Sequence, residues 1–128
     1  KFNRLQTEFI NIINDFSRIG IPYDKQDKKF ILKFVDKFDD EYFANEVSEG
    51  VLYFLAMLCI VHQPNPPKLL LLEEPERGIH PRRIHEVMNF IFRLSEEKDI
   101  QIILTSHNEN VLNYFSNSPE SVFVFDKN

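Results

Sequence analysis

The feature that most constrains the fold is the segment LLLLEEPERGIHP, residues 69–81. Its four consecutive leucines are typical of a strand that is buried on both faces of a parallel sheet. The apolar run ends at two adjacent carboxylates, Glu73 and Glu74, and a proline-containing polar turn follows. We therefore predict a buried strand over 69–72 whose carboxyl end carries paired acidic groups.

The residues after this strand alternate between helical and strand patterns. Pro81 suits the first turn of a helix. The buried stripe of that helix is predicted at Ile84, Val87, Met88, Ile91 and Leu94. Apolar runs at 100–104 and 121–125 predict two more strands, with a short helix around Val111 between them. The order strand–helix–strand–helix–strand predicts an α/β sheet with right-handed crossovers.

The first third of the chain is predicted to form a helix and a hairpin. Residues 4–19 carry apolar side chains at helical spacing, and a glycine then ends the pattern. The β-rich runs 30–38 and 41–47 are separated by two aspartates. Strand-forming runs on either side of a short polar turn predict a β-hairpin.

Ser48 is predicted to be the N-cap of a second helix, over 50–62. Because this helix is apolar on nearly every side, we expect it to be buried. Cys59 lies within it and is expected to pack in the core rather than react. A single cysteine also excludes an internal disulfide framework and fits a reducing, cytoplasmic compartment.

Charge and hydropathy exclude some classes of protein. The net charge is −5 and no dense block of Lys and Arg is present, which argues against a dedicated nucleic-acid surface. No apolar run approaches the roughly 20 residues that span a bilayer, so we expect no membrane segment.

The polar ends of the two central strands predict a ligand site. In open α/β sheets, ligands gather at the carboxyl ends of the strands. Adjacent strand residues point to opposite faces, so Glu73 and Glu74 can do different work. One carboxylate can hold Mg²⁺, and the other can orient and deprotonate a water. His107 follows the next strand, ~5 Å away, and is expected to approach the same pocket. Either carboxylate alone would indicate only that the strand ends there and the chain enters solvent.

These motifs, in this order, resemble the C-terminal lobe of an ABC-type ATPase head. The strand, acidic pair, proline and turn resemble the Walker B motif and D-loop. The sequence EEPERGIHP most resembles the RecF-like and SMC-related branch of these ATPases. Within that branch, it most resembles the bacterial predicted AAA-type ATPases of the overcoming-lysogenisation-defect and antiphage type. Upstream, VSEGVLYFLAML resembles the signature motif and its helix, and downstream IILTSH resembles the switch-histidine strand. The resemblance covers residues 45–128 and extends loosely to 1–44.

The resemblance implies roles for five residues. Glu73 would hold Mg²⁺ through water, and Glu74 would be the general base that polarises the hydrolytic water. His107 would contact the γ-phosphate. Ser48 and the backbone of Gly50 would donate to the γ-phosphate of an ATP held by a second protomer.

The resemblance also implies the fold class and the division of the chain. The fold would be α/β, a partial P-loop NTPase of the ABC type with a parallel sheet flanked by helices. Residues 1–47 would form an N-terminal helix and β-hairpin that precede the signature motif, and 48–128 would form the C-terminal ATPase lobe. No G-x-x-x-x-G-K-[ST] loop is present. We therefore expect an N-terminal Walker A lobe of the same protein, and weak or no ATP binding by this chain alone.

The implied function is ATP hydrolysis at a homodimer interface formed by the signature motif and D-loop. Hydrolysis would drive an attached effector, such as a nuclease or a DNA-binding arm, in DNA repair or phage defence. Two departures leave an alternative open, a non-catalytic dimerisation module: Glu49 replaces a small signature residue, and Glu73 replaces the usual aspartate. A third interpretation, a Mg²⁺-dependent nuclease, lacks the extra carboxylates that a two-metal site requires.

Overall fold

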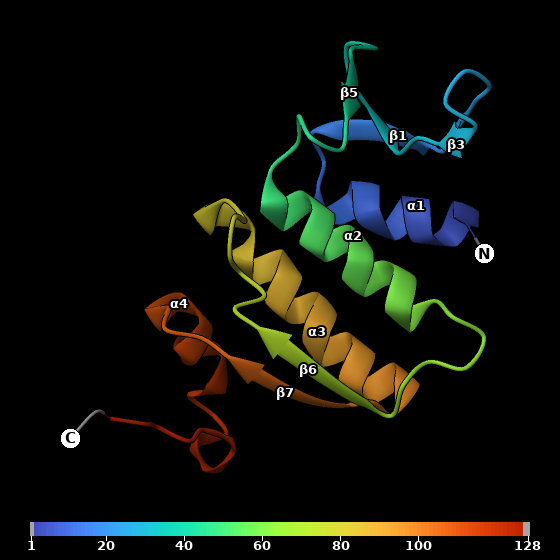
Figure 1. Cartoon of the computed structure of the whole chain (residues 1–128). Helices are drawn as coiled ribbons and strands as arrows, with labels where there is room; N and C mark the ends of the chain where they lie inside the picture. Colours follow the sequence, from blue (N-terminus) through green and yellow to red (C-terminus); the bar gives the residue numbers. More distant parts are fainter. Residues whose placement is uncertain (1, 127–128) are drawn as a thin grey trace.

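A computed structural model describes residues 2–126 of the 128-residue chain. In chain order the elements are α1 (Phe2–Ile12), β1 (Phe16–Gly20), β2 (Tyr23–Asp24), β3 (Lys29–Phe30), β4 (Lys33–Asp36), β5 (Glu41–Phe43), α2 (Glu49–Val61), β6 (Leu69–Glu73), α3 (Ile84–Lys98), β7 (Gln101–Thr105) and α4 (Glu109–Leu112). Three 3₁₀ turns are η1 (Pro81–Arg83), η2 (Asn113–Phe115) and η3 (Pro119–Ser121). Figure 1 shows α1, α2 and α3 side by side, with a small antiparallel sheet at one end and β6 and β7 alongside α3.

The predicted central strands are confirmed, and they pair in parallel. β6 and β7 align from Leu69 opposite Gln101 to Glu73 opposite Thr105. The prediction that this sheet is buried on both faces is wrong for the described residues, because helices cover one face only. Leu70 faces the core, whereas Leu71 is 67% exposed.

The predicted third strand, 121–125, is also wrong. A strand needs a hydrogen-bonded neighbour. Within residues 2–126, this segment makes only turn hydrogen bonds, from Ser121 N to Ser118 O and from Val122 N to Pro119 O. Phe123, Val124 and Phe125 are exposed, and Phe125 is 93% exposed.

The helix after β6 has the predicted apolar stripe. All five stripe residues are buried against the core: Ile84, Val87, Met88, Ile91 and Leu94. Phe90 joins them and packs edge-on against Phe54 of α2, with ring centroids 5.3 Å apart. The helix ends at Asp99 in the left-handed conformation, whose N–H caps the carbonyl of Ser95.

The predicted helix over 4–19 is wrong in its second half. α1 ends at Ile12, and Phe16 begins β1, which pairs antiparallel with β4. Strand geometry aims Phe16 at Phe9 and Phe34, with centroid distances of 6.2 and 5.2 Å. Pairing with β4 overrides the local helical spacing. The predicted hairpin is confirmed as β4 and β5, with Phe34 opposite Tyr42.

The predicted second helix is confirmed as α2, with Ser48 as its N-cap. Phe54 and Leu58 are fully buried, as expected for an apolar helix. The prediction that Cys59 packs in the core is wrong, because its side chain is exposed. It lies one turn after exposed Ala56, on a helix face that no described element covers.

Candidate functional site

The carboxyl ends of β6 and β7 bring Glu74 and His107 together. The N–H of Glu74 donates to Thr105 O at 2.9 Å, which extends the parallel ladder one residue beyond β6. The Nδ1 atom of His107 then lies 2.7 Å from Oε1 of Glu74. The imidazole is 82% exposed and the carboxylate 29% exposed, so solvent and a ligand can reach both. Sequence reasoning anticipated this proximity.

The backbone reverses at Glu74. Its φ of 45° lies in the left-handed region, which costs a non-glycine residue roughly 1–2 kcal/mol. A turn follows, in which Arg77 N donates to Glu74 O at 2.8 Å and Ile79 N donates to Glu76 O at 3.1 Å. Backbone strain of this kind concentrates at functional sites. We call residues 74–80 the acidic turn.

A pocket of about 440 Å³ opens beside this pair. It is lined by Glu74, Glu76, Arg77, His107, Asn108, Glu109 and Asn110. Three of these side chains are carboxylates, and Arg77 is the sole lining Lys or Arg. A polyphosphate would therefore need added positive charge to settle here, which a divalent cation supplies.

Buried Glu76 in the pocket wall is hydrogen-bonded to half-buried Ser106, a pair that sequence reasoning did not identify. Glu76 is only 7% exposed. Its Oε1 accepts a hydrogen bond from the Ser106 hydroxyl, and among residues 2–126 its Oε2 has no hydrogen-bond partner. The available signal was a glutamate inside a proline-flanked turn, but the partner, 30 positions along the chain, could not be read from it.

Ser48 and Gly50 contact the far end of the acidic turn. Ser48 Oγ accepts from Val51 N at 3.4 Å and lies 3.5 Å from Gly78 O. A Cβ on Gly50 would lie 2.4 Å from the carbonyl carbon of Gly78, and Gly78 itself has a φ of 70°. The start of α2 and the acidic turn therefore pack backbone against backbone.

The five predicted site residues thus fall into two groups. Glu74 and His107 share a pocket. Glu73 directly precedes Glu74 and is exposed, but it does not line that pocket. Ser48 and Gly50 lie beyond the acidic turn and do not line that pocket. The structure therefore places these two groups at different points along the acidic turn.

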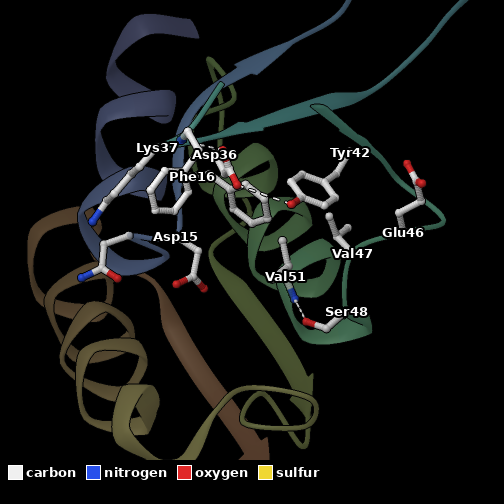
Figure 2. Close-up of a pocket in the computed structure, with 11 residues that line it drawn as sticks. Asp15, Phe16, Asp36, Lys37, Tyr42, Glu46, Val47, Ser48 and Val51 are labelled. Atoms are coloured by element: carbon white, nitrogen blue, oxygen red, sulfur yellow. Dashed lines mark hydrogen bonds between the residues drawn. The ribbon is translucent and has the colours of Figure 1, made fainter. Parts of the chain in front are cut away.

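A second pocket, of about 480 Å³, lies between the hairpin and the start of α2. Figure 2 shows Ser48 at its edge, hydrogen-bonded to Val51. Its charged lining side chains are Asp15, Asp36, Lys37 and Glu46. Because carboxylates outnumber the lysine, the interior of this pocket repels a triphosphate, and an anion would approach Ser48 from outside it.

Tyr53 of α2 lies close to the acidic end of β6. Burial raises the pKa of the Tyr53 phenol; a hydrogen bond with the backbone of Glu73 opposes this rise, and the negative charges of Glu73 and Glu76 add to it. Its place close to both carboxylates was not anticipated from the sequence.

The acidic residues alone do not make a closed metal site. In the described part of the chain, no group of three or more His, Cys, Asp and Glu side chains could hold a metal ion. Mg²⁺, however, takes one or two protein carboxylates and completes its shell with phosphates and water. The single exposed carboxylate of Glu73 fits that requirement. No helix among residues 2–126 has the length and hydropathy needed to cross a membrane.

Comparison with known proteins places these features in a family. Residues 2–113 match the family described as "AAA domain, putative AbiEii toxin, Type IV TA system". The chain is 32% identical over 112 residues to a "Putative ABC transporter ATP-binding protein" of Pyrococcus horikoshii, covering 85% of this chain and 38% of that protein. It is 28% identical over 109 residues to an energy-coupling factor transporter ATP-binding protein of Enterococcus faecalis, covering 81% of this chain and 36% of that protein. The chain therefore spans less than two-fifths of the length of these relatives.

The fold is similar to that of a solved SMC ATPase. The TM-score is 0.62 at 13% sequence identity, over 87% of this chain and 71% of the other. That protein is described by its ATP-driven dimerization and DNA-stimulated activation. The α/β fold is thus of the P-loop NTPase type found in SMC ATPase heads, as the resemblance implied. Because the family match spans most of its length, the chain belongs to the AAA-domain family. It is similar in sequence to ABC-type ATP-binding proteins and in fold to an SMC ATPase.

Proposed function

We propose that this chain is the C-terminal lobe of an ABC-type ATPase that binds and hydrolyses ATP at a dimer interface. The observation that carries the proposal is the contact between Glu74 and His107, with 2.7 Å between Oε1 and Nδ1. A carboxylate beside an imidazole, both open to solvent at the end of parallel strands, suits the handling of a water and a phosphate.

In this proposal Glu74 is the general base. Its carboxylate would orient the attacking water and take its proton, a role worth about 10²–10⁴-fold in rate. His107 holds this carboxylate in place and would contact the γ-phosphate. The left-handed backbone at Glu74, with φ 45°, aims the side chain at His107 rather than along the strand.

Glu73 would hold Mg²⁺ in the same proposal. Bound Mg²⁺ would neutralise phosphate charge, which the carboxylate-rich pocket cannot do with Arg77 alone. Glu73 is exposed at the last paired position of β6, opposite Thr105, so its carboxylate is accessible to an ion carried in with ATP.

Ser48 and Gly50 would serve the ATP of a second protomer. The N-terminus of α2, a 13-residue helix, presents free N–H groups and partial positive charge to an anion. The separation of this group from the Glu74 pocket supports action in trans. The ATP-driven dimerization ascribed to the SMC neighbour supports a homodimer here too.

The remaining parts of the ATPase would come from sequence outside this chain. We propose that residues 1–47 form the helix and hairpin before the signature motif, and 48–128 the catalytic lobe. An N-terminal Walker A lobe would grip ATP, and the dimer would move an attached effector such as a nuclease or DNA-binding arm.

Substituting Glu74→Gln in the intact ATPase tests the proposal. The amide keeps the shape of the side chain but cannot accept the proton. We expect kcat for ATP to fall by about 10²–10⁴-fold, and an ATP-bound dimer to accumulate in size-exclusion chromatography with light scattering. Glu97→Gln, on the exposed face of α3, is the matched control. Unchanged turnover in Glu74→Gln would refute the assignment.

A second candidate function is a dimerisation module without hydrolysis. The observation that favours it is Glu49, which is exposed in the first turn of α2 beside the proposed phosphate contact. Its negative charge opposes a γ-phosphate there. Dimerisation of the intact wild-type protein with no phosphate release above background would favour this alternative.

A further inference from the structure

We propose that Glu76 is a positioning residue that keeps His107 against Glu74, and that it acts through Ser106. This inference rests on the proposed function and adds a residue to it. Glu76 lies in the acidic turn and Ser106 directly precedes His107, so their hydrogen bond joins the two segments that carry the reacting groups.

Ser106 holds the backbone on both sides of His107. Its hydroxyl donates to Glu76 Oε1, and its Oγ accepts from Asn108 N at 3.0 Å. His107 therefore lies inside a small closed turn anchored to Glu76. Because the imidazole is 82% exposed, little packing restrains it, and this anchored backbone decides where it points.

The acidic turn provides the other half of the arrangement. Arg77 N donates to Glu74 O at 2.8 Å, and Ile79 N donates to Glu76 O at 3.1 Å. Glu74 and Glu76 are thus held in one hydrogen-bonded turn. When Glu76 binds Ser106, it sets the distance between this turn and the end of β7, and hence between Glu74 and His107.

Burial of the Glu76 carboxyl lowers the stability of the fold, which points to a functional reason for a carboxyl at this position. The residue is 7% exposed, and Oε2 has no partner among the described residues. A buried carboxylate oxygen destabilises a fold unless a hydrogen bond replaces the water that it gives up on burial. The same burial argues against Glu76 as the base itself, because Oε2 offers no surface to an attacking water.

Nuclear magnetic resonance of the 128-residue chain tests the positioning directly. Three-bond couplings from the ring Cγ of His107 to its own backbone N and C′ report its χ1 rotamer. We expect one rotamer in the wild type and in Glu76→Gln, whose amide oxygen still accepts from Ser106. We expect averaged couplings in Glu76→Ala and in Ser106→Ala. Glu97→Gln is the control for loss of a distant carboxylate.

ATP turnover by the intact protein is the second readout. We expect Glu76→Ala to lower kcat by at least about tenfold with KM for ATP changed less than about threefold, and Glu76→Gln to stay within about threefold of wild type. A loss of packing alone would not be rescued by Gln while KM stayed constant. Thermal melting of each variant checks that it is folded, and Ser106→Ala decides the matter if Glu76→Ala does not fold.

The outcomes separate this inference from the proposed function. A single His107 rotamer in Glu76→Ala and Ser106→Ala overturns the inference, as does an unchanged kcat in both variants of an active enzyme. Averaged couplings in these variants, in a protein whose intact wild type releases no phosphate, sustain the positioning role and refute ATP hydrolysis.

Discussion

The close packing of α2 on the acidic turn predicts that Gly50→Ala destabilises the fold, whereas helix propensity alone predicts that it stabilises the fold. In Gly50→Ala the new Cβ would lie 2.4 Å from Gly78 C, 2.6 Å from Gly78 O and 2.7 Å from Arg77 O. All three are backbone atoms, so no side-chain rotation can relieve the contact. To restore an ordinary separation of about 3.4 Å, the turn has to move away from the helix by about 1 Å.

The magnitude follows from two opposing effects. Overpacking a tight contact costs about 1–3 kcal/mol. Alanine favours a helix over glycine by about 1 kcal/mol, and less in the first turn, where Gly50 lies. We expect a net loss of about 1–2 kcal/mol, which for a domain of this size lowers Tm by roughly 4–8 °C.

The assay is urea unfolding of the chain followed by circular dichroism, with Gly20→Ala as the matched control. A Cβ on Gly20 would meet only Pro22 Cδ, at 3.7 Å, which is an ordinary contact. We expect Gly20→Ala to be neutral or slightly stabilising. If Gly50→Ala is as stable as Gly20→Ala, or gains stability as helix propensity alone predicts, the inferred backbone packing of α2 on the acidic turn is wrong.

Two further predictions concern α1 and the cap of α2. Burial alone would raise the pKa of Glu8, but the hydrogen bond and charge of His62, 3.0 Å away, together with Arg4, hold the pKa below its ordinary value. Ionised Glu8 therefore stabilises the fold above its unfolded pKa, and this contribution is lost as the pH falls through the folded pKa. Glu8→Gln should flatten the loss of unfolding free energy below about pH 4.5, and an unchanged acid slope would contradict the ion pair. Ser48→Ala should cost about 1 kcal/mol through loss of the cap on Val51 N. Ser48→Asp should keep that stability but lose ATP turnover in the intact protein, because it repels a phosphate; retained turnover would argue against the phosphate contact.

Local patterns were sufficient where one element meets the core along a regular stripe. The 3.6-residue spacing of α3 predicted its buried face, and Ser48 before an apolar run predicted the start of α2. The run that ends at Glu73 and Glu74 predicted a strand with a polar edge. Each of these features depends on residues that are close together in the sequence, so the sequence pattern alone is enough to predict it.

Long-range contacts decided the rest. Phe16 has helical spacing, yet pairing of β1 with distant β4 makes it a strand residue. The run 121–125 has the composition of a strand but has no described neighbour to pair with it, and Leu71 is exposed because helices cover one face of β6.

The same division holds within the candidate site. The sequence by itself determined which polar residues end the two central strands, because the apolar run of each strand and the polar residues that end it are adjacent in the chain. Only the tertiary structure decided that Glu76 meets Ser106 and that Gly50 lies against Gly78. These pairs are 30 and 28 positions apart, and packing of the whole chain, not the properties of either residue, brings them within contact.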